Sequence, residues 1–186
     1  MNRRQKLDVD RIVEAAYDAI ADDGLARFSM RRLGARLGVD PMAVYHHVGS
    51  KRHLLSLVMG RVVAAIGPTP DGAPWDAAVR HWASAYWQVV AANRELVAAG
   101  LADPEIAAGG IPAVAPLHAA VAASGLAEEL IDANVYLVVD FVHGSALGSS
   151  EPLYGDGAPG SVRGLFDSGL DTIIAGIAAR SADAAS

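Results

Sequence analysis

Apolar residues recur every three or four positions along most of the chain, and no stretch alternates apolar and polar residues as a half-buried strand does. This period predicts an all-α protein. The first helix is expected between Asp8, a suitable N-cap, and Gly24, a suitable terminator. Its inner face comprises Val9, Ile12, Val13, Ala16 and Ile20.

Two short helices with a tight turn between them are expected next. Ser29 is a good N-cap for a helix over 30–37, which Gly38 can end because glycine tolerates a left-handed backbone. Asp40 followed by Pro41 then provides an N-cap and a first-turn proline, so a third helix starts almost at once and runs to about residue 48. The spacing predicts two helices joined by a turn of three or four residues.

A fourth helix is expected from the cap at Ser50 to residue 66, where the breaker segment GPTPDGAP (67–74) follows. Further helices are expected at about 75–94, 113–124, 127–147 and 161–180. The pattern therefore divides the chain into an N-terminal domain (1–50), a connecting helix (51–66) and a C-terminal helical domain (67–186).

The run MRRLGARLGVDPMAVYHHV has the spacing of a DNA-reading helix-turn-helix. Leu33, Leu37, Val39 and Val44 form a wedge between the two helices, and Gly34 keeps side-chain volume out of their closest approach. The third helix would then turn a polar and aromatic face outward, where a major groove of double-stranded DNA could receive it. The residues on this face are Pro41, Met42, Ala43, Tyr45 and His46.

The segment LGVDPMAVYHHVGSKRHLL resembles the TetR family of transcriptional regulators, and the resemblance covers about residues 8–60. It implies phosphate contacts by Tyr45 and Lys51, and a base or phosphate contact by Arg31. It also implies that Pro41, Met42, Ala43 and His46 lie beside base edges. Lys51 stands at the start of a helix, where the dipole also favours a phosphate.

Structural alternatives stand beside these roles. Tyr45 would be a buried core residue in one of them, and Arg31 and Lys51 would be solvated surface charges. His46 and His47 diverge by about 100° on a helix, so they cannot chelate one metal ion from one face. His47 is interpreted as a packing residue or a phosphate donor, and no metal or other cofactor is expected.

The net charge of −6 hides a division along the chain. Residues 1–66 carry 11 Lys and Arg against 7 Asp and Glu, whereas residues 67–186 carry 4 against 14. Arg3, Arg4 and Lys6 would form a basic arm on DNA. The chain has no cysteine, which excludes disulfides and thiolate sites. We expect a cytoplasmic protein, since no signal peptide is evident and the apolar stretch Val135–Leu147 is too short to span a membrane.

The last helix carries an apolar stripe that requires a partner. With the apolar helix at 127–147 it suits a four-helix bundle between two subunits, the homodimer that the family resemblance also implies. The alternative is an intramolecular core. The expected interface residues are Val162, Leu165, Phe166, Leu170, Ile173 and Ile177.

Polar and aromatic residues interrupt the apolar helices of the C-terminal domain, which suggests a pocket for a small-molecule effector. Because a buried carboxylate or imidazole needs a partner, either Asp140 and His143 pair with each other as a satisfied core pair or they recognise something polar. The lining would favour an apolar or aromatic effector. The expected pocket residues are Trp82, Tyr86, Asn93, His118, Tyr136, Asp140 and His143.

Together these features predict a homodimeric repressor whose two recognition helices enter successive major grooves of a near-palindromic operator, about 34–36 Å apart. Effector binding would weaken operator affinity. One alternative is an enzyme with Asp140 and His143 as an acid-base pair, although no phosphate-binding glycine loop or metal-spaced cluster accompanies them. The other is an architectural DNA-binding protein without a sensor, which would bind without preference for a palindrome.

Overall fold

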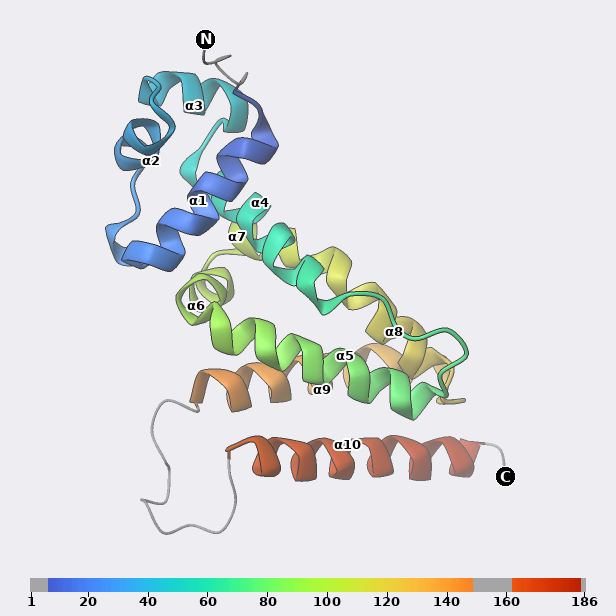
Figure 1. Cartoon of the computed structure of the whole chain (residues 1–186). Helices are drawn as coiled ribbons and strands as arrows, with labels where there is room; N and C mark the ends of the chain where they lie inside the picture. Colours follow the sequence, from blue (N-terminus) through green and yellow to red (C-terminus); the bar gives the residue numbers. More distant parts are fainter. Residues whose placement is uncertain (1–6, 149–161, 185–186) are drawn as a thin grey trace. The chain divides into compact units, whose positions relative to one another are not determined.

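The computed structural model describes residues 7–148 and 162–184, and every regular element in these two ranges is a helix (Figure 1). The all-α class expected from the sequence is confirmed. The helices form two compact units. The N-terminal unit runs to Val62 and also includes Glu95–Ile111, whereas the C-terminal unit comprises Val63–Arg94 and the residues from Pro112 onward.

The helices at the start of the chain have the bounds that the sequence pattern predicts. Side-chain oxygens accept a backbone N–H at all four expected N-caps, at 2.7–3.3 Å. These caps are Asp8, Ser29, Asp40 and Ser50. The elements are α1 (Val9–Asp23), η1 (Leu25–Arg27), α2 (Met30–Leu37), α3 (Pro41–Val48) and α4 (Lys51–Val63), the last followed by η2 (Ala64–Ile66).

The four helices α1, α2, α3 and α4 share a small apolar core within the N-terminal unit. Phe28, which follows η1, is 5% exposed and belongs to this core. Burial of several aliphatic side chains supplies the main stabilisation, at about 1.5–3 kcal/mol for each fully buried valine, leucine or isoleucine. The fully buried members are Ile12, Ala16, Leu33, Val44, Leu54 and Val58.

Arg61 of α4 also makes polar contacts with α1. The Arg61 guanidinium donates from Nε and Nη2 to the two oxygens of Glu14, at 2.6 and 2.8 Å. The same guanidinium lies 3.8 Å from the ring centroid of Tyr17. Arg61 thus engages α1 through a bidentate pair and a cation–π contact, geometries that guanidinium favours.

The Arg61–Glu14 pair predicts that the protein loses part of its folding stability in acid. The hydrogen bonds from Arg61 hold the pKa of Glu14 below its ordinary value of 4.5. A carboxyl with a depressed pKa stabilises the fold at higher pH and loses that contribution as the pH falls through its folded pKa. We therefore expect the urea midpoint to fall between about pH 6 and pH 3, and to fall less in Glu14→Gln. Identical pH profiles for the two proteins would contradict this role.

The sequence pattern missed the helices after residue 93, which are α6 (Arg94–Ala102), α7 (Pro104–Ala107) and η3 (Ala108–Val114). The whole of this segment was assigned to the C-terminal domain (67–186), but Glu95–Ile111 belongs to the N-terminal unit. Polar contacts explain the difference: Arg52 Nε lies 2.9 Å from Asp103, and the Ser50 hydroxyl donates to Glu105 at 3.3 Å.

The C-terminal unit is a bundle of longer helices: α5 (Trp75–Ala92), α8 (Ala115–Ala122), α9 (Glu128–Gly148) and α10 (Val162–Ala184). These correspond to the helices expected from the sequence. Within this unit α5 packs against α8, α9 and α10, and α9 also packs against α8 and α10. The fully buried Trp82 and Leu117 and the buried valines of α9 make up much of its core.

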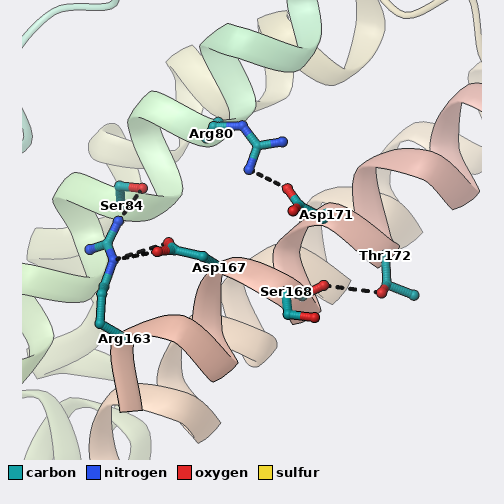
Figure 2. Close-up of polar contacts among 7 residues, drawn as sticks. All are labelled: Arg80, Ser84, Arg163, Asp167, Ser168, Asp171 and Thr172. Carbon is teal, nitrogen blue, oxygen red and sulfur yellow. Dashed lines mark hydrogen bonds and ion pairs between the residues drawn. The ribbon is translucent and has the colours of Figure 1, made fainter. Parts of the chain in front are cut away.

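One ion pair and one hydrogen bond join α5 to α10 (Figure 2). Arg163 donates to Ser84 at 2.9 Å and to Asp167, one turn along α10, at 3.0 and 3.2 Å. Arg80 lies 2.5 Å from Asp171. These contacts set the register of α10 along α5, while their partial exposure limits what each adds to stability.

Two helical stretches, Pro104–Ala122 and Glu128–Gly148, are long and apolar enough to cross a membrane by length and composition alone. The sequence argument, which considered only Val135–Leu147, underestimated this length. A core helix passes the same test because its buried face is apolar. In α9, Val135, Val138 and Val142 are buried inside the C-terminal unit.

Candidate functional site

The turn between α2 and α3 depends on two glycines. Gly38 has φ +68°, a left-handed conformation in which its N–H bonds to the carbonyls of Ala35 and Gly34. A Cβ on Gly34 would lie 3.0 Å from the Val39 carbonyl oxygen and 3.1 Å from the Pro41 nitrogen. Glycine at position 34 therefore allows α3 to approach α2 closely, as the sequence predicts.

One face of α3 is held in the core while the other is open. Val44 and Val48 are 0% and 2% exposed and anchor the helix on α1 and α2. On the outer side Met42 is 60% exposed, and His46 and His47 are also exposed. His47 is therefore not a packing residue. The other expected contact residues are half-buried: Pro41, Ala43 and Tyr45.

The arginines of α2 differ in what they contact. Arg36 pairs with Asp22 at 2.8 Å and Arg32 lies 3.9 Å from Asp23, so α1 partly neutralises both. Arg31 is exposed and has no ion pair within the described ranges. Arg31 is thus the cation of α2 best placed to serve an external phosphate or base. The basic arm of Arg3, Arg4 and Lys6 lies outside the described residues.

Lys51 has a structural contact that the sequence did not reveal. Its Nζ donates to the Phe28 carbonyl oxygen at 3.0 Å and lies 5.4 Å from the Phe28 ring centroid. It also occupies the first turn of α4, beside the Ser50 cap. An ammonium group has three donors, so this bond leaves others for a phosphate.

The polar and aromatic cluster of the C-terminal unit lies between α5 and α9. The Tyr86 hydroxyl and His143 Nε2 share a hydrogen bond of 2.6 Å, and the Trp82 and Tyr86 ring centroids are 4.8 Å apart. Burial lowers the pKa of His143, an effect that Asp140 partly opposes, and raises the pKa of Tyr86 to about 12. Both groups are therefore neutral at physiological pH.

Two further hydrogen bonds of this cluster were not expected. Trp87 Nε1 donates to the Ser145 hydroxyl at 3.2 Å, again between α5 and α9. The Trp82 Nε1 group donates to the Ala113 carbonyl oxygen at 2.7 Å. Ser145 lies two residues from His143, and Trp87 lies one residue from Tyr86. Neither separation puts two side chains on one helix face, so helical spacing gave no signal for this pair.

Several expected pocket residues lie elsewhere. Tyr136 is 68% exposed, and Asp140 is exposed rather than bonded to His143, because the His143 ring turns to Tyr86 and the carboxylate stays in water. His118 lies at the surface, 3.4 Å from Asp132. Asn93 ends α5, where its side-chain amide donates to the Val89 carbonyl oxygen at 2.8 Å. Of the two alternatives that the sequence left open for Asp140 and His143, the satisfied core pair is therefore wrong.

Half of the expected interface residues are buried inside the protomer. Phe166, Leu170 and Ile177 are 0–1% exposed, and the Phe166 ring stacks on Phe141 with centroids 5.5 Å apart. For these three the intramolecular core is correct, because α10 packs on α9 and α5 of its own chain. Ile173 is half-buried, whereas Val162 and Leu165 are 40% and 56% exposed.

Comparison with known families and structures gives consistent matches. Residues 12–58 match the family model described as bacterial regulatory proteins, tetR family. The transcriptional repressor DrrR1 of Streptomyces coeruleorubidus is 45% identical over 56 residues, which are 30% of this chain and 21% of that repressor. The chain thus matches only about a fifth of that relative's length.

Solved structures match over nearly the whole chain. Apo ActR from Streptomyces coelicolor is similar with a TM-score of 0.82 and 26% identity, over 97% of this chain and 99% of ActR. ActR has also been solved in complex with actinorhodin. BioQ bound to its natural double-stranded DNA operator is similar with a TM-score of 0.76 and 26% identity, over 94% of this chain and 99% of BioQ.

Proposed function

We propose that the chain is a member of the TetR family of bacterial regulatory proteins and a sequence-specific DNA-binding repressor of transcription. It acts in the cytoplasm as a homodimer and is released from a near-palindromic operator by a small-molecule effector. The observation that carries this proposal is the outer face of α3, with exposed Met42 and His46 on a helix fixed by Val44 and Gly34.

This face suits a major groove because the opposite side of α3 is packed in the core and the exposed side carries both polar and apolar groups. His46 offers hydrogen-bonding groups to base edges, and Met42 and Ala43 offer apolar contact to thymine methyl groups. Tyr45, Arg31 and Lys51 would contact the phosphates that fix the register. The binding of BioQ to its own operator supports the same use of this fold.

The homodimer interface is best placed on the exposed faces of α9 and α10. Tyr136 and Leu137 of α9 are 68% and 49% exposed, and Leu165 of α10 is 56% exposed. Exposed residues of α10 also recur at alternating intervals of three and four, the spacing of a coiled-coil seam, and most are small enough for close packing. They are Leu165, Ser168, Thr172, Ala175, Ala179 and Ala182.

The effector is an aromatic molecule with hydrogen-bonding substituents that inserts between α5 and α9. Trp82, Tyr86 and Trp87 offer ring faces and edges, and His143 and Ser145 offer exchangeable hydrogen bonds. The complex of ActR with actinorhodin supports a ligand site in this fold. Neutral Tyr86 and His143 favour a polar, uncharged or weakly acidic group over a strong cation.

The proposal is tested by incubating the purified protein with sheared genomic DNA at moderate salt and sequencing the retained fragments. Enrichment of a few near-palindromic sites supports a specific regulator. Uniform retention would instead support architectural binding, and no retention would refute the DNA-binding function. A retained site then serves as the operator in the measurement below.

Alanine variants of Arg31 and Lys51 should distinguish a loss of DNA contact from a loss of folding stability. We expect Arg31→Ala to weaken operator binding and to reduce the salt slope of log K by about one, as for one phosphate contact. Its urea midpoint should not change, because Arg31 is exposed and has no ion pair within the described ranges. Lys51→Ala should lower both the slope and the midpoint, since it also removes the bond to Phe28. An unchanged slope for Arg31→Ala, measured by fluorescence anisotropy, would remove Arg31 from the interface.

A further inference from the structure

Two consecutive residues, Arg94 and Glu95, are anchored in different units. The boundary between the units falls at the peptide bond that joins them. Arg94 belongs to the C-terminal unit, where its guanidinium donates to the carbonyl oxygen of Ala146 at 2.6 Å and to that of Leu147. These carbonyls belong to the last turn of α9, an end of the helix at which a cation is favoured.

Glu95 belongs to the N-terminal unit and bonds the connection between α1 and α2. Its Oε2 accepts the backbone N–H of Leu25 at 2.5 Å. Gly24, which precedes Leu25, leaves room for this carboxylate: a Cβ at that position would lie 3.3 Å from Glu95 Oε2. The bond reaches 70 residues along the sequence and holds the chain a few residues before the helix-turn-helix.

The connection between α5 and α6, which precedes these two residues, is short and held by hydrogen bonds. Asn93 alone separates α5 from α6. Its backbone N–H bonds to the carbonyls of Val89 and Val90, and its side-chain amide donates to the Val89 carbonyl oxygen at 2.8 Å. Arg94 and Glu95 therefore follow directly from a closed helix end, without a flexible linker between the two anchors.

We propose that the Arg94–Glu95 pair is a coupling element that links the last turn of α9 to the α1–α2 connection. His143 and Ser145 of the aromatic cluster lie within one turn of the carbonyls that Arg94 binds. A ligand that displaces this end of α9 moves Arg94, and with it Glu95 and the backbone at Leu25. The inference rests on the proposed function for its regulatory meaning. By linkage, DNA binding acts back on α9 through the same two residues.

The test is residue-resolved amide hydrogen exchange on the full chain, without DNA or ligand. Glu95→Gln should raise exchange at Leu25 by about tenfold, since the amide loses a charged acceptor, and by about threefold in the last turn of α9. Arg94→Gln should accelerate exchange in that turn and, by about threefold, at Leu25. Unchanged exchange at Leu25 in Arg94→Gln would overturn the proposal.

Matched variants separate coupling from general loosening. Arg163→Gln removes bonds to Ser84 and Asp167 in the unit that contains Arg94, and Glu105→Gln removes the bond to Ser50 in the unit that contains Glu95. Each should change exchange only in its own unit. If Arg163→Gln accelerates Leu25 as much as Arg94→Gln does, the effect is general and the proposal fails.

The exchange test contains no DNA, so its outcome is independent of the DNA-retention experiment. Failure of the coupling would leave a DNA-binding repressor that is regulated by another route. Where a retained operator fragment is available, adding it to the wild-type protein should slow exchange in the last turn of α9 by about threefold. The same addition to Glu95→Gln should leave that turn unchanged, and equal slowing in the two proteins would overturn the proposal.

Discussion

Replacing Phe166 by aspartate should unfold the C-terminal unit rather than merely separate two subunits. The Phe166 ring is 1% exposed, with centroids 5.5 Å from Phe141 and 5.8 Å from Trp87. Truncating a buried phenylalanine costs about 3–5 kcal/mol, and a carboxylate in the same place adds a desolvation penalty. We expect a loss of helical circular dichroism or a urea midpoint too low to define a folded baseline.

The neighbouring Leu165→Asp is the matched control. Leu165 is 56% exposed, so the new carboxylate would be solvated in the protomer and the fold should persist. On the proposed interface it would instead face a second copy, so sedimentation should show dissociation at micromolar concentration and operator affinity should fall. A folded but monomeric Phe166→Asp, with Leu165→Asp unaffected, would reverse the assignment of the two faces of α10.

The N-terminal helices were predictable because local rules decide them. Asp8, Ser29, Asp40 and Ser50 each satisfy an orphan N–H of the helix that follows, and such caps can be read from a few residues. Gly38 and the proline after Asp40 similarly define the turn by their backbone preferences. The exposed face of α3 followed once Val44 was assigned to the wedge.

The helices α6 and α7 could not be predicted in the same way. They are short, carry no sustained apolar stripe, and are held by contacts such as Leu25–Glu95 and Arg52–Asp103 that join residues distant in sequence. Lys51 illustrates the same limit, because its bond to the Phe28 carbonyl depends on how α4 packs. A charge at a helix start is visible in a sequence, but its partner is not.

The C-terminal assignments show what periodicity leaves open. An apolar stripe indicates that one face of a helix is buried. It does not indicate whether the same chain or a second copy buries that face. On α10 the large residues Phe166 and Leu170 are buried against other helices of the same chain. The small exposed residues form the second stripe, which is the one proposed to contact a second copy. On α9, Asp140 and His143 share helical spacing but point to different surroundings, which only the packing of α5 decides.

The close crossing of η3 over α4 gives the second large expected effect. A Cβ on Gly109 would lie 1.8 Å from the Ser56 carbonyl oxygen and 2.7 Å from its carbonyl carbon. A Cβ on Gly60 would lie 3.3 Å from the Gly109 carbonyl oxygen, so both backbones use glycine at this point. Because backbone atoms of a helix cannot rotate away as a side chain can, Gly109→Ala must separate η3 from α4.

We expect Gly109→Ala to destabilise the N-terminal unit by about 3 kcal/mol, the upper part of the range for overpacking. Exchange should rise along Glu95–Ile111, since the Arg52–Asp103 and Ser50–Glu105 contacts lose their geometry when the segment shifts. The caps and core of α1 to α3 do not involve Gly109, so their bounds should remain. Urea unfolding and residue-resolved exchange measure the two effects separately.

Gly100→Ala is the control because it adds the same methyl group in the same segment. There the nearest atom to a new Cβ is the terminal methyl of Met59, at 3.0 Å, which is the flexible end of a side chain. The helical preference of alanine over glycine, about 1 kcal/mol, offsets the adjustment of Met59, so the net change should be near zero. Equal urea midpoints for the two variants would mean that η3 does not need glycine where it crosses α4, and that the docking of Glu95–Ile111 tolerates a wider separation.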